Sequence, residues 1–109
     1  MAELPGGLLD AVKDYLQMSW ILSAKEIATI TGYINRGMSY LNEKAGVPDG
    51  ESLDFTLEEA HRTLLLDYCL YARSHALDEF QDNYLPELIA LQNREEVKRY
   101  IAEQEETDV

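Results

Sequence analysis

The feature that most constrains the fold of this chain is the spacing of its apolar residues, which recur every three or four positions. The clearest run consists of Ile27, Ile30, Ile34, Met38 and Leu41. This period places the side chains on one face of an α-helix. Ser23 followed by Glu26 is a capping box that predicts the start of the helix, and Gly46 predicts its end after about Lys44.

Similar spacing predicts helices on both sides of this segment. A first short helix is expected over residues 7–18, where leucine and valine recur at helical intervals. Thr56 followed by Glu59 repeats the capping pair, so a further helix is expected to begin there. This helix either ends near Ser74 or continues to Asn83.

The C-terminal part of the chain contains a proline that interrupts helical structure. Pro86 predicts a break or a new start near residues 83–85. A short apolar turn follows at 88–91, and Asn93 with Glu96 resembles a third capping pair. The helix that it opens is predicted to bury three apolar residues: Val97, Tyr100 and Ile101. Residues 103–109 form an acidic tail that is expected to fray.

No segment shows the period-two alternation of a β-strand, and no repeat or Gly-rich linker divides the chain. The predicted fold is therefore all-α: a single small bundle of four to five helices joined by short loops, with a frayed acidic C-terminal tail. One helical domain is expected over residues 1–109. Its core should span about residues 7–92, and the C-terminal helix and tail residues 93–109.

The net charge limits the partners that the chain can bind. The 109 residues carry a formal charge of −12. A surface this negative repels the phosphate backbone of nucleic acids and anionic membranes, which proteins bind through Lys and Arg. We therefore expect no sequence-specific nucleic acid and no membrane as partners. DNA can still pass along such a surface without being held.

The N-terminus and the single cysteine predict a soluble intracellular protein. The opening residues have no basic region, and Asp10 interrupts their apolar run, unlike a signal peptide. Cys69 is alone, so no internal disulfide is possible.

No pattern of catalytic or metal-binding residues stands out. His61 and Cys69 are eight positions apart, about 12 Å along a helix and too far for one metal ion. His75, Glu79 and Asp82 are better spaced but typical of a solvated helix face. Cys69 between apolar neighbours is typical of a buried small side chain. We therefore predict no enzymatic activity, no metal and no cofactor.

Aromatic residues provide the candidates for an interaction surface. Tyr33 and Tyr40 lie on one line of their helix, with Gly37 between them. A helical glycine costs about 1 kcal/mol relative to alanine, which close approach of another helix would explain, from the same subunit or from a neighbour. The other candidates are Tyr71, Phe80, Tyr84 and the loop residue Trp20. Each of these aromatic residues either completes the core or contacts a neighbouring subunit.

Three stretches of sequence together resemble a known family. These are "LLDAVKDYLQM", the long helix "EIATITGYINRGMSYLNEKAGV" and the aromatic-acidic segment "LLLDYCLYARSHALDEFQDNYLPELIAL". In this order, over about residues 7–92 of a chain of this length, they resemble the helical head–tail connectors, or head-completion adaptors, of tailed bacteriophages.

The resemblance implies a structural virion protein at the capsid–tail junction, present in the host cytoplasm during assembly. Members of the family form rings, typically of about twelve subunits, beneath the portal protein. Such a ring extends the DNA channel and meets the next connector, stopper or tail component. It also implies that the segment from Arg94 onward, including Lys98, Arg99 and Tyr100, docks to the portal. The loop 47–55 is short for a part in lining the channel.

Two other functions fit the composition. An acidic protein can mimic DNA and inhibit a nucleic-acid enzyme, although basic residues interrupt the acidic ones here: Arg62, Arg73, Arg94, Lys98 and Arg99. A small helical regulatory binding protein is the other alternative, and would be expected to form a compact dimer instead of a ring.

Overall fold

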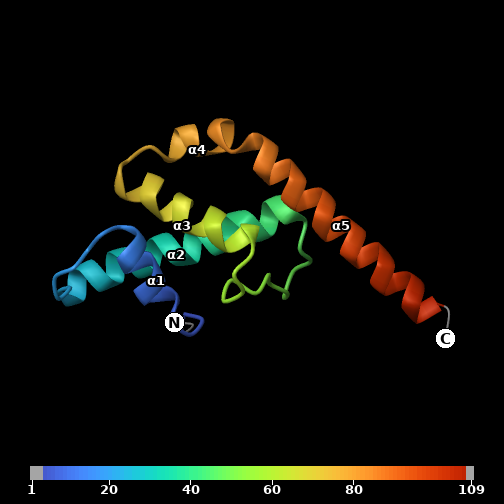
Figure 1. The fold of residues 1–109 in the computed structure, drawn as a ribbon, viewed down its shortest axis with the longest axis horizontal. Helices are drawn as coiled ribbons and strands as arrows, with labels where there is room; N and C mark the ends of the chain where they lie inside the picture. The colour runs from blue at the N-terminus through green and yellow to red at the C-terminus, as the bar shows by residue number, and fades with distance from the viewer. Residues whose placement is uncertain (1–3, 108–109) are drawn as a thin grey trace.

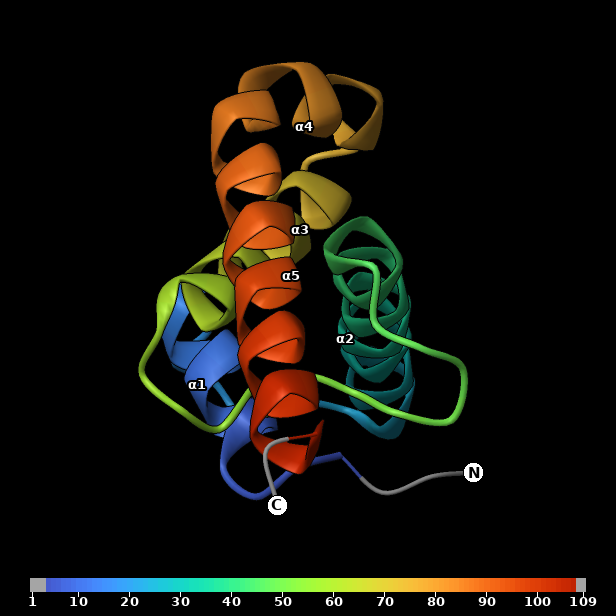
Figure 2. The same cartoon turned by 90° about the vertical axis from the view of Figure 1, so that its right-hand side faces the viewer.

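The computed structural model describes residues 4–107 and is all-α over that range, as predicted. Its five helices are α1 (Leu8–Tyr15), α2 (Ala24–Ala45), α3 (Ala60–Arg73), α4 (Leu77–Asn83) and α5 (Leu85–Thr107). Figure 1 shows α2 running through the middle of the molecule, with α3 above it and α1 below. In Figure 2, α5 lies in front of α3 and beside α2.

Helix α2 has the boundaries that its sequence predicts. The Glu26 amide donates to Ser23 Oγ at 3.1 Å, and the Ser23 amide donates to Glu26 Oε1 at 3.0 Å, which completes the capping box. Gly46 follows Ala45 in the left-handed region, with φ 73°. A left-handed glycine satisfies the last carbonyls of a helix at little steric cost.

The predicted end of α1 and the predicted start of α3 were wrong. Helix α1 ends at Tyr15, before residue 18, because Gln17 takes a positive φ of 60° and turns the chain. Helix α3 begins after Glu59 and has no side-chain cap. Both the amide and the hydroxyl of Thr56 donate to Asp54 Oδ1 instead. This local turn takes Thr56 out of the position that a cap requires.

The chain between α3 and α5 breaks twice, which decides between the two predicted ends of α3. His75 has φ 57°, so α3 ends at Arg73 and α4 is a separate helix. Pro86 occupies the second position of α5, where no intrahelical partner for its nitrogen is needed. The break predicted near residues 83–85 is confirmed.

Helix α5 contradicts the prediction of a new helix at Asn93. It is continuous from Leu85 to Thr107, so Asn93 and Glu96 lie inside a helix and cap nothing. Residues 103–107 of the predicted acidic tail belong to this helix, and residues 108 and 109 lie outside the described range. Figure 1 shows the C-terminal part of α5 extending past the end of α2.

The apolar core forms where α1, α3 and α5 pack around α2. Its members, from Leu8 to Leu91, are buried side chains of all five helices, together with Leu16 and Met18 after α1 and Phe55 of the loop before α3. The extents of the molecule are 53 × 29 × 22 Å, with a radius of gyration of 15.4 Å. A compact domain of this length has a radius of gyration of about 13 Å. The projecting α5 accounts for the elongated shape.

Gly37 is a point of close approach between α2 and α3. A Cβ atom at this position would lie 2.6 Å from Leu65 Cδ1 and 2.8 Å from Tyr68 Cδ1. Leu65 is fully buried and Tyr68 is 8% exposed, so neither side chain has free space into which to move. The glycine is therefore required by packing within the subunit.

Replacing Gly37 by alanine should lower the free energy of unfolding by about 1–3 kcal/mol, because the added methyl group overpacks the α2–α3 contact. Gly32 is the matched control, since it lies in the same helix and a Cβ there meets only Arg36 Nη2 at 3.9 Å. Gly32→Ala should raise stability by up to about 1 kcal/mol through helix propensity. Urea unfolding of both variants tests this, and a stabilising Gly37→Ala would contradict it.

Candidate interaction surfaces

Four of the predicted interface residues belong to one aromatic cluster inside the chain. Phe80 of α4 lies at its centre, with ring centroids 4.7 Å from Tyr84, 5.4 Å from Tyr71 and 5.8 Å from Tyr40. Tyr68 of α3 completes the cluster at 5.4 Å from Phe80. Most of these pairs have the edge-to-face geometry that aromatic rings prefer. The cluster fastens α4 to α2 and α3.

This arrangement corrects part of the predicted interface. Phe80 is 1% exposed, and Gly37 is buried beneath α3, so neither can contact a neighbouring subunit in this structure. Tyr40, Tyr71 and Tyr84 are partly buried and pack against the core. Their exposed edges remain candidates for contact with a partner.

Trp20, in the loop before α2, and Tyr33, near the middle of that helix, are not part of the cluster. Trp20 is 46% exposed and donates from Nε1 to Glu26 Oε2 at 3.1 Å. Tyr33 is partly buried, with the Arg36 guanidinium 5.6 Å from its ring centroid. Trp20 therefore keeps the exposed position that a contact with another protein requires.

The predicted portal-docking residues have different surroundings. Arg99 Nη2 donates to the carbonyl oxygen of Ala45 at 3.2 Å, which ties α5 to the end of α2. Lys98 Nζ lies 3.3 Å from Glu95 Oε2, an intrahelical ion pair. Tyr100 is 63% exposed. Arg99 therefore has a structural role within the subunit, whereas Tyr100 is available to a partner.

The outer face of α5 is an exposed apolar surface that was not predicted from the sequence. We call it the outer stripe, and its residues are Leu85, Ile89, Val97, Tyr100 and Ile101, which are 46%, 48%, 56%, 63% and 51% exposed. At 100° per residue they lie within about 160° of the helix circumference, opposite the buried Leu88 and Leu91. The prediction that Val97, Tyr100 and Ile101 face the interior is therefore wrong. If the helix had been predicted to run continuously from residue 85, the same spacing rule would have placed these three residues on the exposed face.

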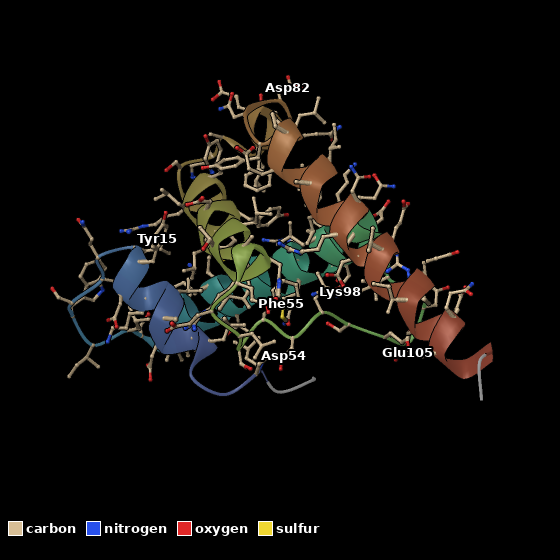
Figure 3. All side chains as sticks on the ribbon, turned by 45° about the vertical axis from the view of Figure 1, so that its right-hand side comes forward. Tyr15, Asp54, Phe55, Asp82, Lys98 and Glu105 are labelled. Atoms are coloured by element: carbon tan, nitrogen blue, oxygen red, sulfur yellow. The ribbon has the colours of Figure 1, made fainter. Side chains whose placement is uncertain are left out.

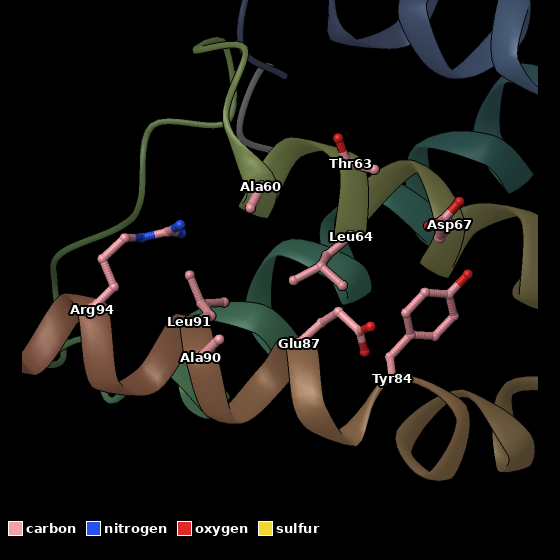
Figure 4. Close-up of a pocket in the computed structure, with 9 residues that line it drawn as sticks. All are labelled: Ala60, Thr63, Leu64, Asp67, Tyr84, Glu87, Ala90, Leu91 and Arg94. Carbon is pink, nitrogen blue, oxygen red and sulfur yellow. The ribbon is translucent and has the colours of Figure 1, made fainter.

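A groove separates α3 from α5. Its cavity has a volume of about 360 Å³. Helix α3 lines one side with Ala60, Thr63, Leu64 and Asp67. The other side is formed by Tyr84, just before α5, and by four residues of α5: Glu87, Ala90, Leu91 and Arg94. Figure 4 shows the Arg94 guanidinium reaching across one end of the groove towards Ala60, while Glu87 and Tyr84 point towards the end that holds Asp67. The walls between the two ends are mainly apolar.

Asp67 is a buried carboxylate, 9% exposed, that joins α3 to α1. It accepts a hydrogen bond from the Tyr15 hydroxyl, across 52 positions of sequence. This bond, with burial and the negative charge of Asp67, raises the pKa of Tyr15 from 10.0 to about 12. Burial, followed by the charge of Asp67, also raises the pKa of Tyr84. In Figure 3, Tyr15 lies on α1, away from the projecting end of α5 that carries Glu105.

The Tyr15–Asp67 bond predicts a loss of stability at high pH. A raised folded-state pKa stabilises the fold fully below the ordinary pKa of 10.0, and this contribution disappears as the pH rises through about 12. Thermal unfolding between these pH values should therefore show a smaller decrease in Tm for Tyr15→Phe than for the unchanged protein. Parallel curves would contradict the assignment, because Tyr84 and Cys69 titrate in both proteins.

The remaining reactive residue types lie in structural positions. Burial raises the pKa of the Cys69 thiol to about 12, so it is protonated at neutral pH. His61 is buried, with Nε2 2.6 Å from the Asp54 carbonyl oxygen. Among residues 4–107, no group of three His, Cys, Asp or Glu side chains is arranged to hold a metal ion. Within the same range, no helix has the length and apolar character needed to cross a membrane.

Comparison with known proteins identifies no relative, since no protein family, curated protein or solved structure matches this chain.

Proposed function

We propose that this chain is the subunit of a head–tail connector of a tailed bacteriophage, in which copies assemble as a ring and join the portal protein to the next connector or tail component. The observation that carries the proposal is the outer stripe of α5. Large apolar side chains gathered on one exposed face are characteristic of protein interaction sites. The sequence resemblance supplies the biological setting, at the capsid–tail junction.

The distribution of surfaces supports assembly with more than one neighbour. Closing a ring requires two different patches on each subunit. The outer stripe lies on α5, and the exposed Trp20 lies at the far end of α2 from the aromatic cluster. Together they offer such a pair of patches on separate elements.

The charge suits a channel for DNA. A formal charge of −12 on each subunit opposes tight binding of a polyanion, so DNA is not held as it passes. The same charge repels identical subunits from one another. Association should therefore strengthen when salt screens the charge, or when the portal protein supplies a template.

Sedimentation in the analytical ultracentrifuge tests the proposal. We expect a monomer at about 0.02 M NaCl and larger species at about 0.5 M, because the Debye length shortens from roughly 20 Å to 4 Å. Purified portal protein should promote the same assembly at low salt. A monomer at every salt concentration, with and without portal protein, would contradict the ring. A compact dimer under all conditions would favour the regulatory protein instead.

A further inference from the structure

The basic end of the α3–α5 groove has hydrogen-bond donors without acceptors. Nε and Nη2 of Arg94 are buried and have no hydrogen-bond partner among the described residues. The closest carboxylate oxygen, Glu95 Oε2, is 3.8 Å from Nε, which is too long for a hydrogen bond. The Arg94 side chain as a whole is 38% exposed, so only these two nitrogens are shielded. A carboxylate is the partner that a guanidinium fits best.

The other end of the groove is acidic. Glu87 lies seven positions before Arg94 on α5, so both side chains lie on one face of the helix, about 10 Å apart along its axis. Asp67 reaches the same end from α3. The groove therefore has the guanidinium of Arg94 at one end and the carboxylates of Glu87 and Asp67 at the other.

Small residues open the space between these ends. Ala60 of α3 faces α5, where Ala90 lies, and Leu64 with Leu91 forms the apolar walls of the cavity. A volume of about 360 Å³ lies within the range of small-ligand sites. The middle of a ligand at this site is expected to be apolar.

We infer that this groove binds an elongated zwitterion with an apolar body, its carboxylate on Arg94 and its ammonium group on Glu87 near Asp67. Its two charges are about 10 Å apart, to match the axial separation of the two side chains on α5. A zwitterion is favoured over a simple anion because it carries no net charge into the field of a protein with charge −12. Glu87 and Asp67 also repel a second carboxylate.

Two sources have this chemistry. A tripeptide with free termini and small apolar side chains spans about 10 Å when extended. A long ω-amino acid has the same charges on an alkyl chain. The groove is lined by residues other than those of the outer stripe, so the inference does not depend on the proposed ring.

Titration followed by ¹H–¹⁵N NMR at low protein concentration tests the inference. Trialanine and ω-aminooctanoate represent the two sources, and octanoate, octylamine and ω-aminobutyrate each lack one required feature. At least one zwitterion of full length should bind with a Kd on the order of 1 mM or tighter, as expected for roughly eleven to sixteen non-hydrogen atoms. Saturable shifts should fall on residues of the groove, and the three reduced compounds should bind at least about tenfold more weakly.

Variants decide whether the binding uses the groove. Arg94→Gln and Glu87→Gln should each weaken binding by about tenfold or more, and Ala90→Leu should abolish it by filling the cavity. Lys98→Gln and Ala102→Leu are matched controls on the same helix outside the groove, and should leave the affinity unchanged. Far-UV circular dichroism establishes that each variant is folded. No binding of either zwitterion, equal binding of octanoate, or equal affinities of Arg94→Gln and Lys98→Gln would overturn the inference.

Discussion

Replacing Phe80 by alanine should lower the free energy of unfolding by about 3–5 kcal/mol, among the largest effects expected for a single side chain. Phe80 is 1% exposed and contacts four tyrosine rings from α2, α3 and the α4–α5 junction. Its removal leaves a cavity that these rings cannot fill without losing their contacts with the core. Domains of this size have total stabilities of about 5–15 kcal/mol, so the variant is expected to be close to unfolding at room temperature.

Chemical unfolding followed by near-UV circular dichroism measures the effect of Phe80→Ala. Tyr100→Ala is the control, because it also removes an aromatic ring but from a position that is 63% exposed. Truncation of an exposed side chain should change stability by no more than about 0.5–1 kcal/mol. Similar losses in the two variants would show that the aromatic cluster is not the point at which α4 is fastened.

The double variant Val97→Gln/Ile101→Gln should weaken self-association by about tenfold to a hundredfold while leaving the subunit folded. Both side chains are about half exposed and belong to the outer stripe. Burying an apolar side chain of this size completely contributes about 1.5–3 kcal/mol, so covering the exposed half of each of two corresponds to about 1.5–3 kcal/mol in total. Glutamine is a good helix former and adds no charge, so α5 itself should persist.

Sedimentation at high salt measures the association of this double variant against that of Ala102→Gln. Ala102 is exposed on the same projecting part of α5, but it lies about 100° outside the outer stripe. The control should assemble like the unchanged protein. Equal association of all three proteins would exclude the outer stripe as the contact between subunits, and would remove the observation on which the proposed ring depends.

Much of the helical structure could be predicted because the responsible interactions are local. The capping box of Ser23 and Glu26, the left-handed Gly46 and the break before Pro86 each act over a few residues, and each was found where the sequence indicated it. Local signals failed where a competing local contact was stronger. Thr56 has the residue type of a cap, but its hydrogen bonds to Asp54 hold it in a turn three residues before Glu59, which is the residue that precedes α3.

The candidate surfaces were less predictable, because they depend on which helix faces which. Gly37 signalled a close helix approach, and only the packing of α3 showed that the approach occurs within the subunit. The stretch from Asn93 to Glu96 looks like a helix start in isolation, yet it lies in the middle of α5. That one error reversed the predicted side of Val97 and Ile101.

The sequence by itself determined the all-helical class, the extent of α2 and the large negative charge, because these follow from residue type and from spacings of three to four positions. Tertiary structure alone decided the Tyr15–Asp67 bond, the groove between α3 and α5, and the exposure of the outer stripe. The bond and the groove bring together residues that are far apart in the chain. The exposure of the outer stripe depends on which face of α5 the other helices cover. The geometry of all three features depends on how helices cross, which no local spacing encodes.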